Sequence, residues 1–510
     1  MKFYDVSSVR QADENAIKKL GIPGVVLMEN AGKEASHIVV EKYPYAQKIC
    51  IVAGPGNKGG DGYVMARHFK EQGLDPLIVL TSPKEKIHGD ARINLDIAER
   101  LCIPIYFSSE CSDEDLRILF RSNDIVVDCL LGTGSIGAPR GEVERAIRLL
   151  QGRRGIVSID IPSGVNGVTG EIYEPCIDAE ITITMLAPKT GLVVMPGSEK
   201  VGELYVAHLG VSPEAILDDK PRAFLWDEKN TAAYLSPRPL GLHKGGRGTL
   251  LIVGGSYLYR GAPLLSALGA LRSGCGVVIV VAPTEVCESG SSFLPEAVFH
   301  PLDNPEEVES LLSWENRATM SVVGPGLGRG ERGRRLMDFL WNQWAHPLLI
   351  DGDGLYWLSE MKGCLRKRRD VILTPHEGEA ATLLGTSAQT IASSRLAAAR
   401  DIAMEWGTVV LKGYRSIIDN GAETAIISRG GPELSIPGSG DVLTGIIGCL
   451  VAGNHFSLLE GAASGAWIHG QAGSCLSCQR GVDGLLARDV ANYIPTVLAE
   501  LRGNHEKAKS

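Results

Sequence analysis

The chain alternates short apolar runs with longer amphipathic segments along almost all of its 510 residues. In the front half, β-branched runs predict strands, and the segments between them, such as ARINLDIAERL, have the hydrophobic spacing of helices. This alternation predicts a parallel sheet covered by helices on both faces. Residues 8–42 predict an amphipathic helical arm ahead of the sheet. The predicted strands are KICIVAG, PLIVLTS, NDIVVDCLLG, GIVSIDIPSG and AEITITMLA.

The alternation stops at residues 211–247, where four prolines and no sustained periodicity predict a linker. A hairpin is expected around Asn420-Gly421, which suits a type I′ turn. A run of helices is expected from Asp441 to Leu501. The chain is therefore predicted to form two α/β domains. Between the linker and the hairpin, the predicted strands are TLLIVGGS, GVVIVVAP, MSVVGPG, PLLIDGDG, DVILTP and TVVLKG.

Composition and charge narrow the class of protein. Hydrophobic residues make up 44% and charged residues 22% of the chain, as in soluble globular proteins. The formal net charge of −9 provides no broad basic surface, so nucleic acid is not expected as a partner. The first residues carry charges and no apolar signal core, and no stretch reaches the roughly 18 uncharged apolar residues that a membrane span needs. We expect a cytoplasmic protein without a membrane partner.

Three predicted strand ends in the front half carry glycine and aspartate. The segment Gly54–Gly62, GPGNKGGDG, follows the first strand, and its N–H groups at a helix start suit a phosphate, although such a loop can also be only a tight turn. The segments 128–134 and 160–164 follow two further strands. Ligands of doubly wound sheets bind at this edge, so the loops predict a ligand site. An aspartate there caps a helix, binds a cation or moves protons.

The motifs GPGNxGGDG, DxLLGTG and DIPSG, in this order, resemble those of the NAD(P)H-hydrate epimerase family. The resemblance implies a Rossmann-like domain over residues 1–215 that interconverts the R and S hydrates of NADH and NADPH. It places Asp160 at the damaged nicotinamide ring as the general acid and base. The residues implied to bind the hydrate are Asn57, Lys58, Gly59, Gly60, Asp61, Gly132, Thr133, Gly134, Ser135, Ile136, Gly137, Ala138 and Asp160.

The resemblance also implies a potassium ion at Lys58, Asp128 and Ser163. Lys58 departs from the pattern, because the family usually has asparagine there and an ammonium group cannot ligate a cation. We hypothesise that Lys58 replaces the ion by pairing with Asp128. The alternative is that Lys58 points to solvent and the ion remains. A non-enzymatic module that senses dinucleotides is a further alternative, against which Asp128 and Asp160 argue.

In the back half, Gly438-Ser439-Gly440-Asp441 precedes an apolar helix. Glycines expose N–H groups at the positive helix end, where phosphate charge is stabilised, and the aspartate can accept a proton. A plain capped helix start is the simpler interpretation. Other polar loops follow predicted strands, including Lys412-Gly413, with Ser416 close behind. A lone histidine such as His376 is often structural, but its place at a strand end favours substrate binding.

These motifs, with HKG at 243–245, GGS at 254–256 and GPGLG at 324–328, resemble those of the ribokinase-like NAD(P)H-hydrate dehydratase family. The resemblance implies a ribokinase-like domain over residues 225–505. Ser439 replaces the usual threonine, and DGDGL replaces the usual DADAL. The residues implied to contact the hydrate are Ala262, Gly326, His376 and Asp441. The residues implied to contact the nucleotide are Lys412, Gly413, Tyr414, Arg415, Ser416 and Gly440.

The two resemblances together imply a bifunctional enzyme that repairs the hydrates NADHX and NADPHX. Asp441 would deprotonate the hydroxyl of the S hydrate, a nucleotide would phosphorylate it, and elimination of phosphate would restore the dihydropyridine. Magnesium is expected with ADP or ATP, and the fused arrangement favours ADP by resemblance. Both families also imply a homo-oligomer. The rival hypothesis is a small-molecule kinase, which would release a stable phosphorylated product.

Overall fold

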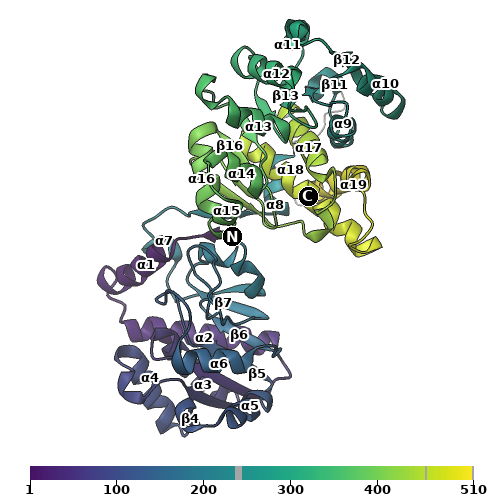
Figure 1. Cartoon of the computed structure of the whole chain (residues 1–510). Helices are drawn as coiled ribbons and strands as arrows, with labels where there is room; N and C mark the ends of the chain where they lie inside the picture. Colours follow the sequence, from purple (N-terminus) through teal and green to yellow (C-terminus); the bar gives the residue numbers. More distant parts are fainter. Residues whose placement is uncertain (236–243, 454–456, 508–510) are drawn as a thin grey trace. The chain divides into compact units, whose positions relative to one another are not determined.

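The computed structural model describes residues 1–235, 244–453 and 457–507 (Figure 1). The chain forms two compact units, Met1–Ala223 and Phe224–Ser510, and each is described by itself. Each unit has its own mainly parallel sheet, so the predicted α/β class is confirmed. No helix in the described ranges is long and apolar enough to cross a membrane.

The front unit contains a parallel sheet in the order β4-β3-β2-β5-β6-β7-β8. The order reverses between β2 and β5, and the carboxyl edge at such a point is where doubly wound sheets bind ligands. Its strands are β2 (Lys48–Ala53), β3 (Asp75–Leu80), β4 (Ile105–Phe107), β5 (Ile125–Cys129), β6 (Ile156–Ile159), β7 (Ile181–Met185) and β8 (Glu203–Ala207). A short β1 covers Lys2–Phe3.

Helices cover both faces of this sheet because successive side chains of a strand point to opposite faces. Ile51 of β2 packs in one buried cluster with Phe69, whereas the next residue, Val52, packs in another with Phe120. The strands are therefore apolar at consecutive positions of the sequence. The helices around the sheet are α3 (Asn57–Glu71), α4 (Gly89–Arg100), α5 (Asp113–Arg121) and α6 (Gly141–Leu150), with a short α7 (Pro213–Ile216) near the end of the unit.

The helical arm predicted over residues 8–42 is divided into two helices. The structure has two helices, α1 (Val6–Lys18) and α2 (Gly24–Lys42). They are separated at Gly21, which has a φ of +71°, and Pro23, which lacks the N–H needed to continue a helix. Met28 and Val39 of α2 are part of the main buried cluster, so this segment belongs to the unit's core.

The strands of the rear unit follow the order β9-β18-β17-β16-β15-β14-β13-β10-β11-β12. Pairing is parallel from β16 to β12 and antiparallel at β16-β17 and β17-β18. The order reverses between β10 and β13. The strands are β9 (Ala223–Trp226), β10 (Thr249–Val253), β11 (Val277–Ala282), β12 (Val298–Pro301), β13 (Met320–Val323), β14 (Leu348–Ile350), β15 (Val371–Leu373), β16 (Thr408–Leu411), β17 (Ile417–Asp419) and β18 (Thr424–Ile427).

Two details of this sheet differ from the predictions. The expected linker contains β9, which pairs with β18, and α8 (Glu228–Tyr234), because the apolar run AFLW can complete the sheet. The hairpin pairs Asp419 with Thr424, so its loop has four residues and the type I′ turn is wrong. The side chain of Asn420 accepts the N–H groups of Ala422 and Glu423, which widens the turn.

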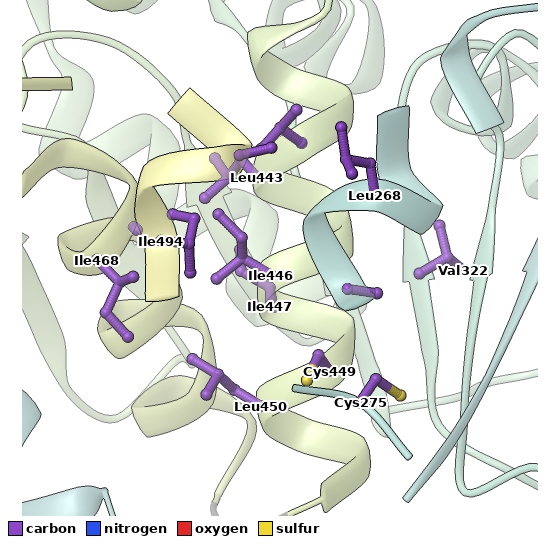
Figure 2. Close-up of a cluster of buried hydrophobic side chains, with 14 of the residues drawn as sticks. Leu268, Cys275, Val322, Leu443, Ile446, Ile447, Cys449, Leu450, Ile468 and Ile494 are labelled. Carbon is purple, nitrogen blue, oxygen red and sulfur yellow. The ribbon is translucent and has the colours of Figure 1, made fainter. Parts of the chain in front are cut away.

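The rear core is built around α17 (Ser439–Gly453), which begins two residues before the predicted start. It is apolar on all sides, as expected of a fully buried helix. Figure 2 shows its leucines and isoleucines between Leu268 and Val322 on one side and Ile468 and Ile494 on the other. The helices that pack on it are α9 (Ala262–Ser273), α18 (Leu458–Arg480) and α19 (Ala487–Lys507).

Glycines allow α9 and α17 to touch backbone to backbone. A β-carbon on Gly445 would lie 1.9 Å from the carbonyl oxygen of Ser266, and one on Gly269 would lie 2.5 Å from that of Val442. This packing fixes the start of α17, and Asp441 with it. The remaining helices are α10 (Thr284–Phe293), α11 (Leu312–Glu315), α12 (Glu331–Asn342), α13 (Asp353–Glu360), α14 (Glu377–Leu384), α15 (Ala388–Ser393) and α16 (Arg395–Trp406).

Candidate active sites

In the front unit, three strand-end loops meet around the side chain of Lys58, in the first turn of α3. Its Nζ lies 3.1 Å from Asp128 Oδ2, 2.9 Å from the carbonyl oxygen of Leu131, 2.8 Å from that of Ile161 and 3.2 Å from Ser163 Oγ. The side chains of Lys58 and Asp128 are 4% and 0% exposed. Lys58 therefore points into the protein and forms a buried ion pair.

Asp128 at the end of β5 is held by further donors. Its Oδ2 accepts hydrogen bonds from Ser158 Oγ at 2.8 Å and from the N–H of Ser163 at 2.9 Å. Its Oδ1 accepts from Ser163 Oγ at 2.6 Å and from the N–H of Leu130 at 3.1 Å. Together with Lys58, these donors use the acceptor capacity of both carboxylate oxygens. With the ammonium group in place, these residues do not fit a bound potassium ion.

Asp160, at the end of β6, pairs with a second buried lysine. Lys189 Nζ lies 2.6 Å from Asp160 Oδ1, 3.0 Å from Thr184 Oγ1 and 3.1 Å from the carbonyl oxygen of Met185. Burial favours a higher pKa for Asp160, but the charge and hydrogen bond of Lys189, the charge of Lys58 and the N–H of Thr133 together lower the pKa below its usual value. The carboxyl group is therefore an ionised base at neutral pH.

The backbone at Asp160 is unusual. Its φ of +66° is left-handed, a conformation that costs energy for a residue other than glycine and that is concentrated at functional sites. The sequence analysis missed Lys189 because its carboxylate partner lies 29 residues away. Its position two residues after the predicted strand AEITITMLA was the available signal.

The other predicted front-site residues occupy the same edge. Asn57 is exposed at the start of α3, and Asp61 is half-buried with a pKa raised well above its usual value, chiefly by burial and the charge of Asp160. The loop 132–138 is mostly exposed. Gly59 also has a packing role, because a β-carbon there would lie 2.2 Å from the carbonyl oxygen of Gly54. This glycine lets the loop pack on itself.

In the rear unit, a network of charges surrounds the start of α17. Lys412 Nζ lies 2.9 Å from Asp351 Oδ1 and 3.7 Å from Glu379 Oε2. A β-carbon on Gly440 would lie 3.6 Å from the same Nζ, so Lys412 reaches the Gly438–Asp441 loop. Burial and the charge of Asp351 raise the pKa of Asp441 to about 7, against the opposing charge of Lys412.

Two cavities meet at this helix start. The first, of about 1080 Å³, is lined by Ser256, Tyr259, Ala262, Gly326, Glu379 and Asp441, among others. The second, of about 870 Å³, is lined by His376, Lys412, Gly413, Tyr414, Ser416 and Gly440, among others. Because Gly440 and Asp441 are consecutive, the two cavities adjoin at the start of α17.

Two of the predicted rear-site residues make contacts within the protein. His376 Nδ1 accepts the N–H groups of Gly378 and Glu379, so this side chain caps α14, and it lines the cavity of Lys412 and not that of Ala262. Arg415 packs against the Tyr414 ring, 5.6 Å from its centroid. The predicted motif residue His243 lies outside the described residues.

Two residues near the second cavity were missed by the sequence analysis. Arg395, 2% exposed, donates to the carbonyl oxygens of Tyr414 at 2.7 Å and Lys412 at 3.1 Å and so fixes the loop after β16. His469 lies 3.2 Å from Ser439 Oγ, and burial lowers its pKa to about 4. Neither residue lies in a recognisable motif, and both lie inside helices.

Comparisons with known proteins agree with this division. A family model described as NAD(P)H-hydrate dehydratase matches residues 250–496, and one described as YjeF-related protein N-terminus matches residues 24–191. The chain is similar to a bifunctional NAD(P)H-hydrate repair enzyme from Thermanaerovibrio acidaminovorans, with 36% identity over 98% of both chains. The same description applies to a relative from Escherichia coli, with 32% identity over 96% of this chain and 92% of that one.

A solved structure resembles the rear unit. A ribokinase-like superfamily protein from Enterococcus faecalis matches 56% of this chain and 98% of its own, with 24% identity and a TM-score of 0.51. The fold and the two sites thus define a two-domain α/β enzyme with a ribokinase-like rear unit. The chain belongs to the family of bifunctional NAD(P)H-hydrate repair enzymes. The predicted family, enzyme class and repair function are confirmed.

Proposed function

We propose that the front unit epimerises the R and S hydrates of NADH and NADPH and that the rear unit dehydrates the S hydrate with ADP or ATP. The observation that carries the proposal is the meeting of two cavities at Gly440-Asp441, beside the ammonium group of Lys412. This arrangement suits the transfer of a phosphoryl group between two bound molecules.

In the front unit, Asp160 is the proposed acid and base. It is an ionised carboxylate at the carboxyl edge of the sheet, held by Lys189, and 14% exposed, so it can reach a bound molecule. Inversion of the hydroxyl-bearing carbon requires one of its bonds to break and to re-form on the opposite face. When the hydroxyl group gives up its proton, the bond from this carbon to the ring nitrogen can open to leave an aldehyde, and closure from the other face returns the proton to the oxygen. The loop 132–138 and the start of α3 are the proposed contacts to the phosphates and sugars of the hydrate.

In the rear unit, Asp441 accepts the proton of the hydrate's hydroxyl group. The hydroxyl oxygen then forms a bond to the terminal phosphorus of the nucleotide, whose bridging oxygen leaves with the electron pair. The phosphorylated hydrate loses its C–O bond to phosphate and a proton from the neighbouring carbon, which restores the double bond of the dihydropyridine. Phosphate is a much better leaving group than hydroxide, so transfer makes the elimination possible.

The charges of the rear site suit a nucleotide. Lys412 and the N–H groups at the start of α17 are positive partners for phosphate oxygens. Magnesium, when bound with a nucleotide, neutralises the phosphate charge that develops during transfer. Glu379, 3.7 Å from Lys412 and on the lining of the first cavity, is a carboxylate that could hold it, which fits a cation bound mostly by phosphate oxygens and water.

The test measures NADH absorbance while the full chain acts on mixed R and S NADH hydrate with magnesium and either ADP or ATP. We expect full recovery of NADH with the preferred nucleotide. Asp160→Asn should limit recovery to the S fraction, and Asp441→Asn should abolish it. A stable phosphorylated product in place of released phosphate would contradict the dehydratase proposal and favour an ordinary kinase.

A further inference from the structure

The side chain of Lys58 occupies a cradle made of oxygen atoms. Its Nζ lies within 2.8–3.2 Å of a carboxylate oxygen, a hydroxyl oxygen and two backbone carbonyl oxygens. These come from the end of β5 and from the segments that follow β5 and β6, whereas Lys58 itself follows β2. The cradle therefore joins the loop after β2 to groups that lie 70 to 105 residues further along the chain.

The chemistry of the cradle is that of a cation site. Backbone carbonyl oxygens replace the hydration shell of monovalent cations in proteins, and a carboxylate supplies the compensating charge. An ammonium group has only three N–H donors, yet four oxygens surround it. The arrangement suits a spherical charge, which an ammonium group at the end of a fixed side chain imitates.

Removal of the charge would be costly. Asp128 is fully buried, and its other partners are neutral hydroxyl and N–H groups. Breaking a buried ion pair by removing one partner leaves a charge without compensation, which destabilises a protein strongly. A cation at this position compensates the buried carboxylate, and in this chain that cation is the covalently attached ammonium group of Lys58.

We propose that the Lys58 ammonium group is the built-in monovalent cation of the front unit, so that this site is stable and functions without bound potassium. The potassium ion implied by the family resemblance is then displaced in this chain. The stability of the site without potassium does not depend on the proposed epimerase function. Only catalysis without potassium rests on that function.

The first test compares melting temperatures of the full chain in potassium chloride and in sodium chloride at equal ionic strength. We expect the two temperatures to agree within about 1 °C. Such a difference corresponds to less than a tenfold change in the equilibrium constant of unfolding. A melting temperature that rises with potassium over sodium would overturn the proposal, because it would show that the ion still binds beside or in place of Lys58. This test needs no hydrate and no variant.

The second test uses Lys58→Asn, which removes the charge and provides an amide oxygen. We expect the melting temperature to fall by roughly 6–12 °C in sodium chloride, as for a broken buried ion pair. Potassium at about 100 mM should restore roughly 3–6 °C of that loss. Lys70→Asn is the matched control, because it changes an exposed lysine of the same helix. It should respond equally to both salts.

If Lys58→Asn does not fold, the double variant Lys58→Met/Asp128→Asn decides the matter. It removes both charges and should melt at the same temperature in both salts. A potassium response in this variant would contradict the assignment of the cradle.

The third test measures epimerisation in both salts. The unmodified chain should show equal rates, and a rate that depends on potassium would overturn the proposal that the front unit functions without potassium. If neither salt supports epimerisation while the melting results hold, the proposed function fails and the cation assignment stands.

Discussion

The front site places two buried lysines beside two carboxylates, and the two pairs have different surroundings. Lys58 and Asp128 are closed off from solvent, whereas Asp160 keeps some exposure while Lys189 is buried. The first pair holds loops together. The second leaves an ionised carboxyl group at the edge where a ligand binds, which is the arrangement of a base and the group that positions it.

At this scale we predict the effect of Lys189→Met. Without the ammonium group, burial raises the pKa of Asp160, and the base is ionised only at higher pH. The epimerisation rate at neutral pH should fall by roughly 100-fold, and the acidic limb of its pH profile should move upward. Lys200→Met, which removes the exposed pair with Asp178, is the control. A lower rate with an unmoved limb would indicate a purely structural role for Lys189.

The rear site gives a pH prediction of its own. Because the pKa of Asp441 is raised to about 7, the carboxyl group is protonated below that pH and cannot accept the hydroxyl proton. The dehydration rate at saturating nucleotide should therefore rise with pH and reach half its maximum near pH 7. Rates measured on the S hydrate across pH 5–9 test this. A midpoint near pH 4 would show that the carboxyl group titrates at its ordinary pKa in the working enzyme, and a rate that does not change with pH in Asp441→Asn and in the unmodified chain alike would remove Asp441 as the base.

At the scale of elements, α17 connects the rear core to the rear site. Its middle packs backbone to backbone on α9, and its first turn carries Gly440 and Asp441 between the two cavities. The loop after β16 reaches the same place and is fixed by Arg395 from α16. The packing of α17 on α9 and the hydrogen bonds of Arg395 thus set the positions of Asp441 and of the loop after β16.

Gly445→Ala tests the contact between α9 and α17. The new β-carbon would collide with the carbonyl oxygen of Ser266, so the helices must separate. We expect a loss of about 3 kcal/mol in the free energy of unfolding, a melting temperature lower by roughly 6–12 °C, and a slower dehydration step. Gly503→Ala is the control, because a β-carbon there meets no atom within 4 Å. Equal stability of the two variants would contradict this account.

Arg395→Met tests the loop after β16. Loss of the guanidinium group leaves the carbonyl oxygens of Lys412 and Tyr414 without these donors, so the loop becomes less ordered. We expect the KM for the nucleotide to rise by roughly tenfold, while the KM for the hydrate and the epimerisation rate stay unchanged. Arg334→Met, at an exposed arginine, serves as the reference. A change in kcat alone would point to a different role.

At the scale of the whole molecule, the chain contains two units with separate cores, and relatives of the same family align over nearly its full length. A stereospecific dehydratase clears a mixed pool of hydrates only if an epimerase supplies its substrate, which gives the fusion a chemical reason. The homo-oligomeric state implied by the family resemblance stays a prediction, and light scattering of the full chain would test it.

The sequence by itself determined the features that depend on local spacing. Runs of β-branched residues located the strands, and motifs at strand ends located Lys58, Asp128, Asp160, Lys412 and Asp441 at the edges of two sheets, because the carboxyl ends of parallel strands share an edge. The family followed from the same motifs. Each of these features can be predicted from a short segment of the sequence.

Only the tertiary structure decided which groups pair. The direction of the Lys58 side chain depends on carbonyl oxygens 73 and 103 residues away, and Lys189, the partner of Asp160, follows β7 and lies 29 residues away in the sequence. The strand β9 exists because β18 offers it an edge. The energy of a buried charge depends on every group around it, and folding brings those groups together from distant parts of the chain.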